Sequence, residues 1–133
     1  MRLAATILAS ILSVACAPTN APAPSFPSAA SVAKLVIRSG TTISEPNQVG
    51  EFIVALGHLN HGWHYPFDTF PSPQASIVFM DAKNLSLCSV HIGPNWLGSN
   101  CGQQREGTMP LVGLTVEQAN YFRNFAGGTW EVK

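Results

Sequence analysis

The chain has 133 residues, of which 46% are hydrophobic and 11% charged, and its seven Lys and Arg residues balance its seven Asp and Glu residues. This length predicts one domain, and the lack of a basic excess argues against nucleic acid as a partner. So few charges are typical of a surface that is partly covered by a partner or lies close to a membrane.

Residues 1–15 have the composition of a secretory signal. Arg2 is followed by residues 3–15, which carry no charge and end in small side chains. One basic residue before a short apolar stretch is the pattern of a signal peptide. The stretch is shorter than the about 20 apolar residues that a membrane-spanning helix needs. We therefore predict that residues 1–15 are a signal peptide.

The segment Leu12-Ser13-Val14-Ala15-Cys16 resembles the lipobox of bacterial lipoproteins, with Ser13 where the typical motif has Leu. The resemblance covers residues 1–17 and implies that signal peptidase II cuts before Cys16, whose thiol then carries lipid. Ala17 is not the aspartate that retains many lipoproteins in the inner membrane, so the resemblance implies an outer-membrane anchor facing the periplasm. Two alternatives stay open: cleavage by signal peptidase I after Ala15, which gives a soluble secreted protein, and an ordinary buried helix in a cytosolic protein.

Three cysteines, Cys16, Cys88 and Cys101, leave one odd thiol in an exported chain. Lipidation of Cys16 accounts for the odd thiol, so Cys88 and Cys101 are left to pair in an oxidising compartment. Closing a loop of this size should stabilise the fold by about 3 kcal/mol. The alternative is two unpaired thiols, one of them buried in a strand.

Residues 16–30 predict a tether between the lipid and the domain. Pro18, Pro22, Pro24 and Pro27 are interspersed with mostly small residues, a composition that makes a poor core and a semi-rigid spacer. At about 3.1 Å per residue, such a spacer would hold a domain roughly 40 Å from the bilayer. Residues 31–133 are then the single domain, with six Lys and Arg residues against seven Asp and Glu residues.

The domain begins with an alternating strand and an amphipathic helix. In residues 31–38, apolar and polar side chains alternate, as in a half-buried strand. Ser44 is the predicted cap of a helix that has Pro46 in its first turn, and the helix should end near Gly62. Its apolar residues recur at helical spacing: Val49, Phe52, Ile53, Leu56 and Leu59.

Residues 61–74 and 93–102 predict two long loops, the first rich in proline and aromatic residues. Between them, residues 75–80 and 85–92 predict a β-hairpin with its turn at residues 81–84. Residues 109–112 predict a short strand. Thr115 and Gln118 form the pattern of a capping box before a helix that ends at Gly127, and residues 129–133 predict a last strand.

The predicted order is strand, helix, strand, strand, helix, strand. This order predicts an α+β fold, a small two-layer sandwich of an antiparallel sheet and two helices. It is the βαββαβ order of ferredoxin-like folds, and other α+β sandwiches share it.

Four histidines are candidate metal ligands. His58, His61 and His64 are spaced three residues apart, and His91 is a candidate fourth ligand from a strand. Imidazoles bind zinc or copper when three or four ligands converge. The alternative is that histidines near the C-terminal end of a helix complement its dipole. A protein without a cofactor is therefore the first interpretation, and a periplasmic lipoprotein that binds zinc or copper is the second.

The two loops are the predicted binding surface. Large aromatic side chains at loop tips often anchor protein partners, and prolines keep a loop stiff, which lowers the cost of ordering it on binding. In the alternative, these rings fold back and cover an open end of the core. The predicted contact residues are Trp63, His64, Tyr65, Phe67, Phe70, Asn95 and Trp96.

No catalytic signature is evident in the sequence, which has no Gly-x-Ser-x-Gly motif and no glycine-rich phosphate loop before a helix. A thiol–imidazole pair would need an unpaired Cys101. We therefore expect a membrane-anchored protein-binding module and not an enzyme. Its size, anchor and loops resemble those of envelope assembly factors and of inhibitor or immunity proteins. This resemblance implies that the partner is another envelope protein or an incoming toxin or hydrolase.

Overall fold

The computed structural model describes residues 19–66, 71–102 and 108–127. The predicted signal peptide, Cys16, Phe67, Phe70 and the predicted last strand lie outside these residues. In chain order the described elements are β1 (Thr19–Asn20), the 3₁₀ helix η2 (Ala29–Ser31), β2 (Lys34–Ile37), β3 (Thr42–Ile43), α1 (Pro46–Gly57), β4 (His64–Tyr65), β5 (Ala75–Met80), β6 (Ser86–Ile92), β7 (Trp96–Ser99), β8 (Leu111–Gly113) and α2 (Val116–Phe125).

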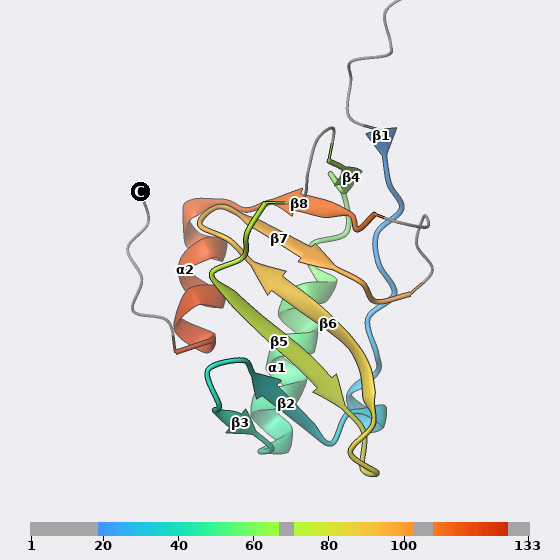
Figure 1. The fold of residues 1–133 in the computed structure, drawn as a ribbon, viewed down its shortest axis with the longest axis vertical. Helices are drawn as coiled ribbons and strands as arrows, with labels where there is room; N and C mark the ends of the chain where they lie inside the picture. Colours follow the sequence, from blue (N-terminus) through green and yellow to red (C-terminus); the bar gives the residue numbers. More distant parts are fainter. Residues whose placement is uncertain (1–18, 67–70, 103–107, 128–133) are drawn as a thin grey trace, which may run out of the picture.

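Within the described residues, the strands form one sheet of eight strands in the order β1-β4-β8-β7-β6-β5-β2-β3. From β5 to β8 each strand pairs with the next one along the chain, so this part of the sheet is a meander. Helices α1 and α2 lie on the same face of the sheet (Figure 1). The predicted fold class, an α+β fold with an antiparallel sheet and two helices, is confirmed.

The more specific ferredoxin-like order is wrong. In that split βαβ order another strand lies between the two strands that a crossover helix joins, whereas β2 and β5, which lie before and after α1 in the chain, pair directly. The chain also adds β7, which lies in a segment predicted as a loop and pairs with β6 and β8. Gly98 and Ser99 have little preference for strands, so these pairings, and not local sequence, hold β7 extended.

The core fills the space between the helices and the sheet. Phe52 of α1 is completely buried at its centre. The centroid of its ring lies 6.0 Å from that of Phe79 on β5, 5.9 Å from that of Phe122 and 4.4 Å from that of Phe125 on α2. One side chain thus joins both helices to the sheet. The sheet contributes Leu35, Ile37, Ile77, Phe79, Val90, Ile92, Leu97 and Val112 to the same cluster.

Side-chain caps set the helix starts. The cap of α1 is Glu45 and not the predicted Ser44, because the Glu45 carboxylate accepts hydrogen bonds from the backbone N–H groups of Asn47 and Gln48, at 3.1 and 2.9 Å. An acidic group at this end also complements the helix dipole. The capping box predicted for α2 is confirmed, with reciprocal bonds between Thr115 and Gln118.

The segment between β1 and β2 packs on the domain instead of forming a free tether. β1 pairs with β4, and the backbone N–H of Ala21 donates to the carbonyl of Trp63 at 3.0 Å. The Phe26 ring lies 6.2 Å from the Trp63 ring and packs against the core. A Cβ atom on Gly102 would lie only 2.9 Å from the backbone nitrogen of Ser25, so the two segments are in close contact. The predicted boundary at residue 31 is therefore wrong, since residues 19–30 belong to the domain.

The predicted disulfide between Cys88 and Cys101 is present, with 5.1 Å between the two Cα atoms. It joins β6 to the segment that follows β7, and Cys101 is completely buried. Such bonds are typical of proteins in oxidising compartments outside the cytoplasm. The disulfide therefore indicates an extracytoplasmic protein.

Candidate functional site

Trp63 is a core residue and not a contact residue, so its predicted role is wrong. Its side chain is 2% exposed. The indole Nε1–H donates a hydrogen bond to the carbonyl of Leu59, and the ring packs beside Phe26. A buried tryptophan usually satisfies its one polar group in this way. The alternative in which an aromatic ring folds back onto the core applies to Trp63.

The other described residues of the predicted loops do not form one exposed surface. His64 and Tyr65 are half-buried and lie in β4, between β1 and β8. Trp96 is half-buried in β7, and a Cβ atom on Gly93 would overlap its indole ring. Asn95 is exposed and lines a small pocket of about 180 Å³ beside the start of α2. Among the described residues, these side chains therefore lie in separate places and do not form one contact surface.

The predicted metal cluster does not form. In the described part of the chain, no group of three or more His, Cys, Asp or Glu side chains is placed to hold a metal ion. His58 follows α1 and lines a groove, whereas Nδ1 of the exposed His61 lies 3.0 Å from the Asn60 side-chain oxygen. Nδ1 of His64 lies 3.3 Å from the Gly62 carbonyl oxygen. Helical spacing would have placed the first two on one face, but α1 ends at Gly57, so the spacing of three no longer aligns the rings.

His91 lies between two serines on the sheet face opposite the core. Its Nδ1 is 2.8 Å from the Ser76 hydroxyl oxygen, and its Nε2 is 3.3 Å from that of Ser89. Burial, and then the positive charge of Arg38, lower the pKa of His91 below its ordinary value of 6.5. The folded protein therefore favours the neutral imidazole, for which a hydroxyl can either donate or accept a hydrogen bond.

This lowered pKa predicts a loss of stability on acidification. The unfolded chain takes up a proton on His91 near pH 6.5, before the folded chain does, so the free energy of unfolding should fall as pH drops below that value. We expect His91→Asn to remove this fall in the free energy of unfolding. Arg38→Gln removes one cause of the lowered pKa, so we expect it to make the fall smaller. Urea unfolding between about pH 7.5 and pH 5.5 measures it. Parallel profiles for wild type and His91→Asn would contradict the prediction.

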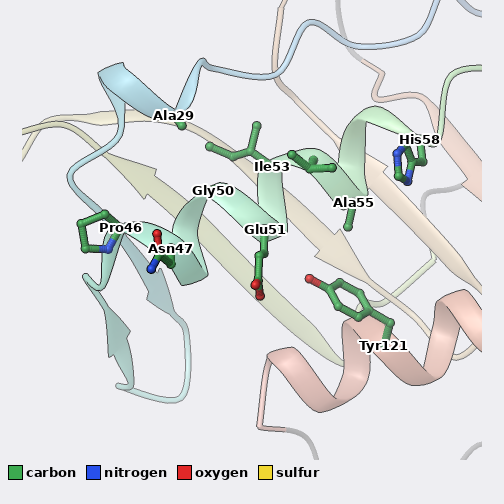
Figure 2. A pocket seen from close by; sticks show the side chains of 10 residues that line it. Ala29, Pro46, Asn47, Gly50, Glu51, Ile53, Ala55, His58 and Tyr121 are labelled. Atoms are coloured by element: carbon green, nitrogen blue, oxygen red, sulfur yellow. The ribbon is translucent and has the colours of Figure 1, made fainter.

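A groove on the helix side of the molecule is the strongest candidate site. This α1 groove has a volume of about 630 Å³ and lies along α1, between η2 and α2. Figure 2 shows its side chains, with Ala29 from η2 on one side and Tyr121 from α2 on the other. The described lining residues are Ala29, Pro46, Asn47, Gly50, Glu51, Ile53, Val54, Ala55, His58 and Tyr121.

The α1 groove is apolar and open. Val54 is 59% exposed and Tyr121 is 38% exposed, although both are large apolar side chains. Gly50 has open space where its side chain would be, since a Cβ atom there would meet nothing within 4 Å. An apolar concave surface with a few polar groups is the usual form of a binding site. The geometry thus suits capture of an apolar side chain.

Two polar groups face each other across this groove. When histidine is counted as neutral, Glu51 is the one charged residue among the described lining residues at neutral pH. Figure 2 shows its carboxylate and the Tyr121 hydroxyl pointing toward one another. Burial of the phenol, and then the negative charge of Glu51, raise the pKa of Tyr121. Tyr121 therefore stays protonated and can donate a hydrogen bond.

Sequence reasoning missed the α1 groove, although one signal was present. The buried residues of α1 are Val49, Phe52 and Leu56. Val54 is an apolar residue that lies off this stripe, where a helix normally presents polar side chains to solvent. On α2, Tyr121 likewise lies off the buried stripe, next to the buried Phe122. The sequence did not predict the groove because its walls come from η2, α1 and α2, which lie together only in the folded domain.

Comparison with known proteins does not assign the chain to a family. No protein-family model matches it, and no curated protein or solved structure matches it either.

Proposed function

We propose that this chain is a lipid-anchored protein of the bacterial cell envelope whose domain binds a protein partner through the α1 groove. The anchor is Cys16, in the outer membrane and facing the periplasm, and the partner contacts are made on the helix side of the domain. The apolar, open groove with exposed Val54 and Tyr121 is the observation that carries the binding role.

The anchor is supported by the lipobox-like segment and by the disulfide. Cys88 and Cys101 pair, which leaves Cys16 as the odd cysteine of the chain. A disulfide of this kind fits an oxidising compartment such as the periplasm. Among the described residues, no helix has the length and apolar character needed to cross a bilayer.

The chemistry of the α1 groove specifies the partner segment. Its apolar walls favour an apolar side chain such as Leu, Ile or Met, because burying such a group contributes about 1.5–3 kcal/mol. The Glu51 carboxylate favours a Lys or Arg beside that residue. The partner is therefore a protein segment with an apolar anchor and an adjacent basic group, contributed by an envelope assembly component or by an incoming toxin or hydrolase.

A photo-crosslinking amino acid at Val54 tests this role in cells that make the protein natively. We expect a specific adduct from this position. The same amino acid at Leu85 is a matched control, since Leu85 is 60% exposed and lies at the β5–β6 turn, away from the groove. Glu51→Lys in the Val54-labelled protein should reduce the adduct by about tenfold or more, because it replaces attraction to a basic group by repulsion.

Two results would contradict the proposed groove. One is equal adduct formation from Val54 and Leu85, which would mean random encounter. The other is a Val54 adduct that Glu51→Lys leaves unchanged. Mass spectrometry of the adduct identifies the partner and distinguishes an assembly component from a toxin or hydrolase.

A further inference from the structure

The position of β1 fixes how far the domain can lie from its anchor. β1 begins at Thr19, three residues after Cys16. Its pairing with β4, Thr19 with Tyr65 and Asn20 with His64, places it at one edge of the sheet. An extended chain spans at most about 3.5 Å per residue, so Cys16 lies within about 10 Å of that edge.

The chain after β1 cannot lengthen this link while the domain stays folded. Ala21 and Phe26 pack against the core, and the Ala21 N–H donates to Trp63. η2 then contacts α1, and β2 pairs with β5 inside the sheet. Releasing residues 19–30 would uncover Trp63 and break the β1–β4 pairing. Residues 19–30, with their prolines, therefore form a docked strap that packs on the domain, and they are not a spacer.

We infer that the edge of the sheet formed by β1 and β4 lies against the phospholipid headgroups of the membrane that holds Cys16. This inference rests on the lipid anchor of the proposed function. The link spans about 10 Å, which is less than the radius of gyration of about 13 Å expected for a domain near this size. The domain therefore cannot stand away from the bilayer as it would on a tether of roughly 40 Å.

The composition of this edge suits a membrane surface. Within the described residues, β1, β4, β7 and β8 contain no Asp, Glu, Lys or Arg. An anionic headgroup layer therefore meets no carboxylate of these strands. The described charges lie elsewhere, on and just after β2, on and before α1, at the β5–β6 turn and on α2: Lys34, Arg38, Glu45, Glu51, Asp81, Lys83, Glu117 and Arg123.

The arrangement also leaves the α1 groove accessible. Figure 1 shows β1 and β4 at one end of the molecule and the β5–β6 turn at the other, with α1 running along the sheet between them. A bilayer at the β1–β4 edge thus meets the molecule at one end, and the helix side stays open to the periplasm.

Fluorescence quenching of the mature protein, as processed by cells that make the full chain, tests the inference. A fluorophore is attached to a cysteine introduced as Asn20→Cys on β1, or as Lys83→Cys at the far turn. The protein is reconstituted in vesicles of phosphatidylethanolamine and phosphatidylglycerol that carry nitroxide-labelled headgroups. We expect the label at position 20 to lose most of its emission and the label at position 83 to keep it. Equal quenching at the two positions would overturn the inference.

A spacer variant tests the cause. Twenty Gly and Ser residues inserted between Cys16 and Ala17 lengthen the link to about 25 Å on average. We expect the label at position 20 to recover its emission, and continued quenching would overturn the short link as the reason for contact. Vesicle flotation separates the two proposals: a protein that floats with equal quenching contradicts the membrane-facing edge alone, whereas a protein that does not float contradicts the anchor as well.

Discussion

Trp63→Ala should destabilise the domain by about 3–5 kcal/mol, the range measured for removal of a large buried aromatic side chain. The indole of Trp63 is 2% exposed and holds together two segments distant in sequence. It packs against Phe26 of the docked strap and bonds to the carbonyl of Leu59, which follows α1. Its loss leaves a cavity and an unpaired carbonyl, which add to the lost burial. Urea unfolding followed by circular dichroism measures the change.

Trp63→Phe is the matched control for this prediction. It keeps an aromatic ring beside Phe26 and removes the Nε1–H donor, so we expect a smaller loss of about 1–3 kcal/mol. If Trp63→Ala left the unfolding midpoint unchanged and abolished partner binding, Trp63 would be a contact residue after all. The buried position assigned to it would then be wrong.

Removing the disulfide should have the second-largest effect. Cys88 and Cys101 are 13 residues apart, and the chain-entropy model gives a loss of about 3 kcal/mol for a loop of this length. The bond also holds in place the segment that follows β7, in which Gly102 is in close contact with Ser25. We expect the double variant Cys88→Ala, Cys101→Ala to unfold at a lower urea concentration than wild type under non-reducing conditions.

Reduction supplies the control for the disulfide. A reductant should lower the unfolding midpoint of wild type and leave that of the double variant unchanged. A single variant is a poor substitute, because it frees a thiol that can form intermolecular bonds. Equal midpoints for oxidised wild type and the double variant would show that the bond adds no stability.

The sequence predicted those elements whose pattern is local. The buried stripe of α1 at Val49, Phe52 and Leu56 follows from helical spacing. The hairpin of β5 and β6 follows from two apolar runs around Asp81, whose carboxylate accepts from the backbone N–H groups of Lys83 and Leu85, at 2.8 and 2.9 Å. Each of these features depends on residues that are close together in the chain.

The features that sequence did not predict depend on distant partners. β7 is extended because β6 and β8 pair with it, although Gly98 and Ser99 favour turns. The docked strap packs on the domain because the Phe26 ring contacts the Trp63 ring, whereas the prolines of the strap alone predict a spacer. The α1 groove needs η2, α1 and Tyr121 together. The predicted contact role of Trp63 failed for the same reason, since an aromatic side chain in a loop can face either solvent or core.

The measurement that bears most directly on the lipid anchor is the intact mass of the mature protein extracted from membranes. Both the proposed function and the membrane-facing edge require a chain that begins at Cys16 and carries lipid on its thiol. We predict that mass for wild type, and an uncleaved, lipid-free precursor for Cys16→Ser. A mature wild-type chain without lipid, recovered in the soluble fraction, would contradict the anchor and the position of the domain against the bilayer.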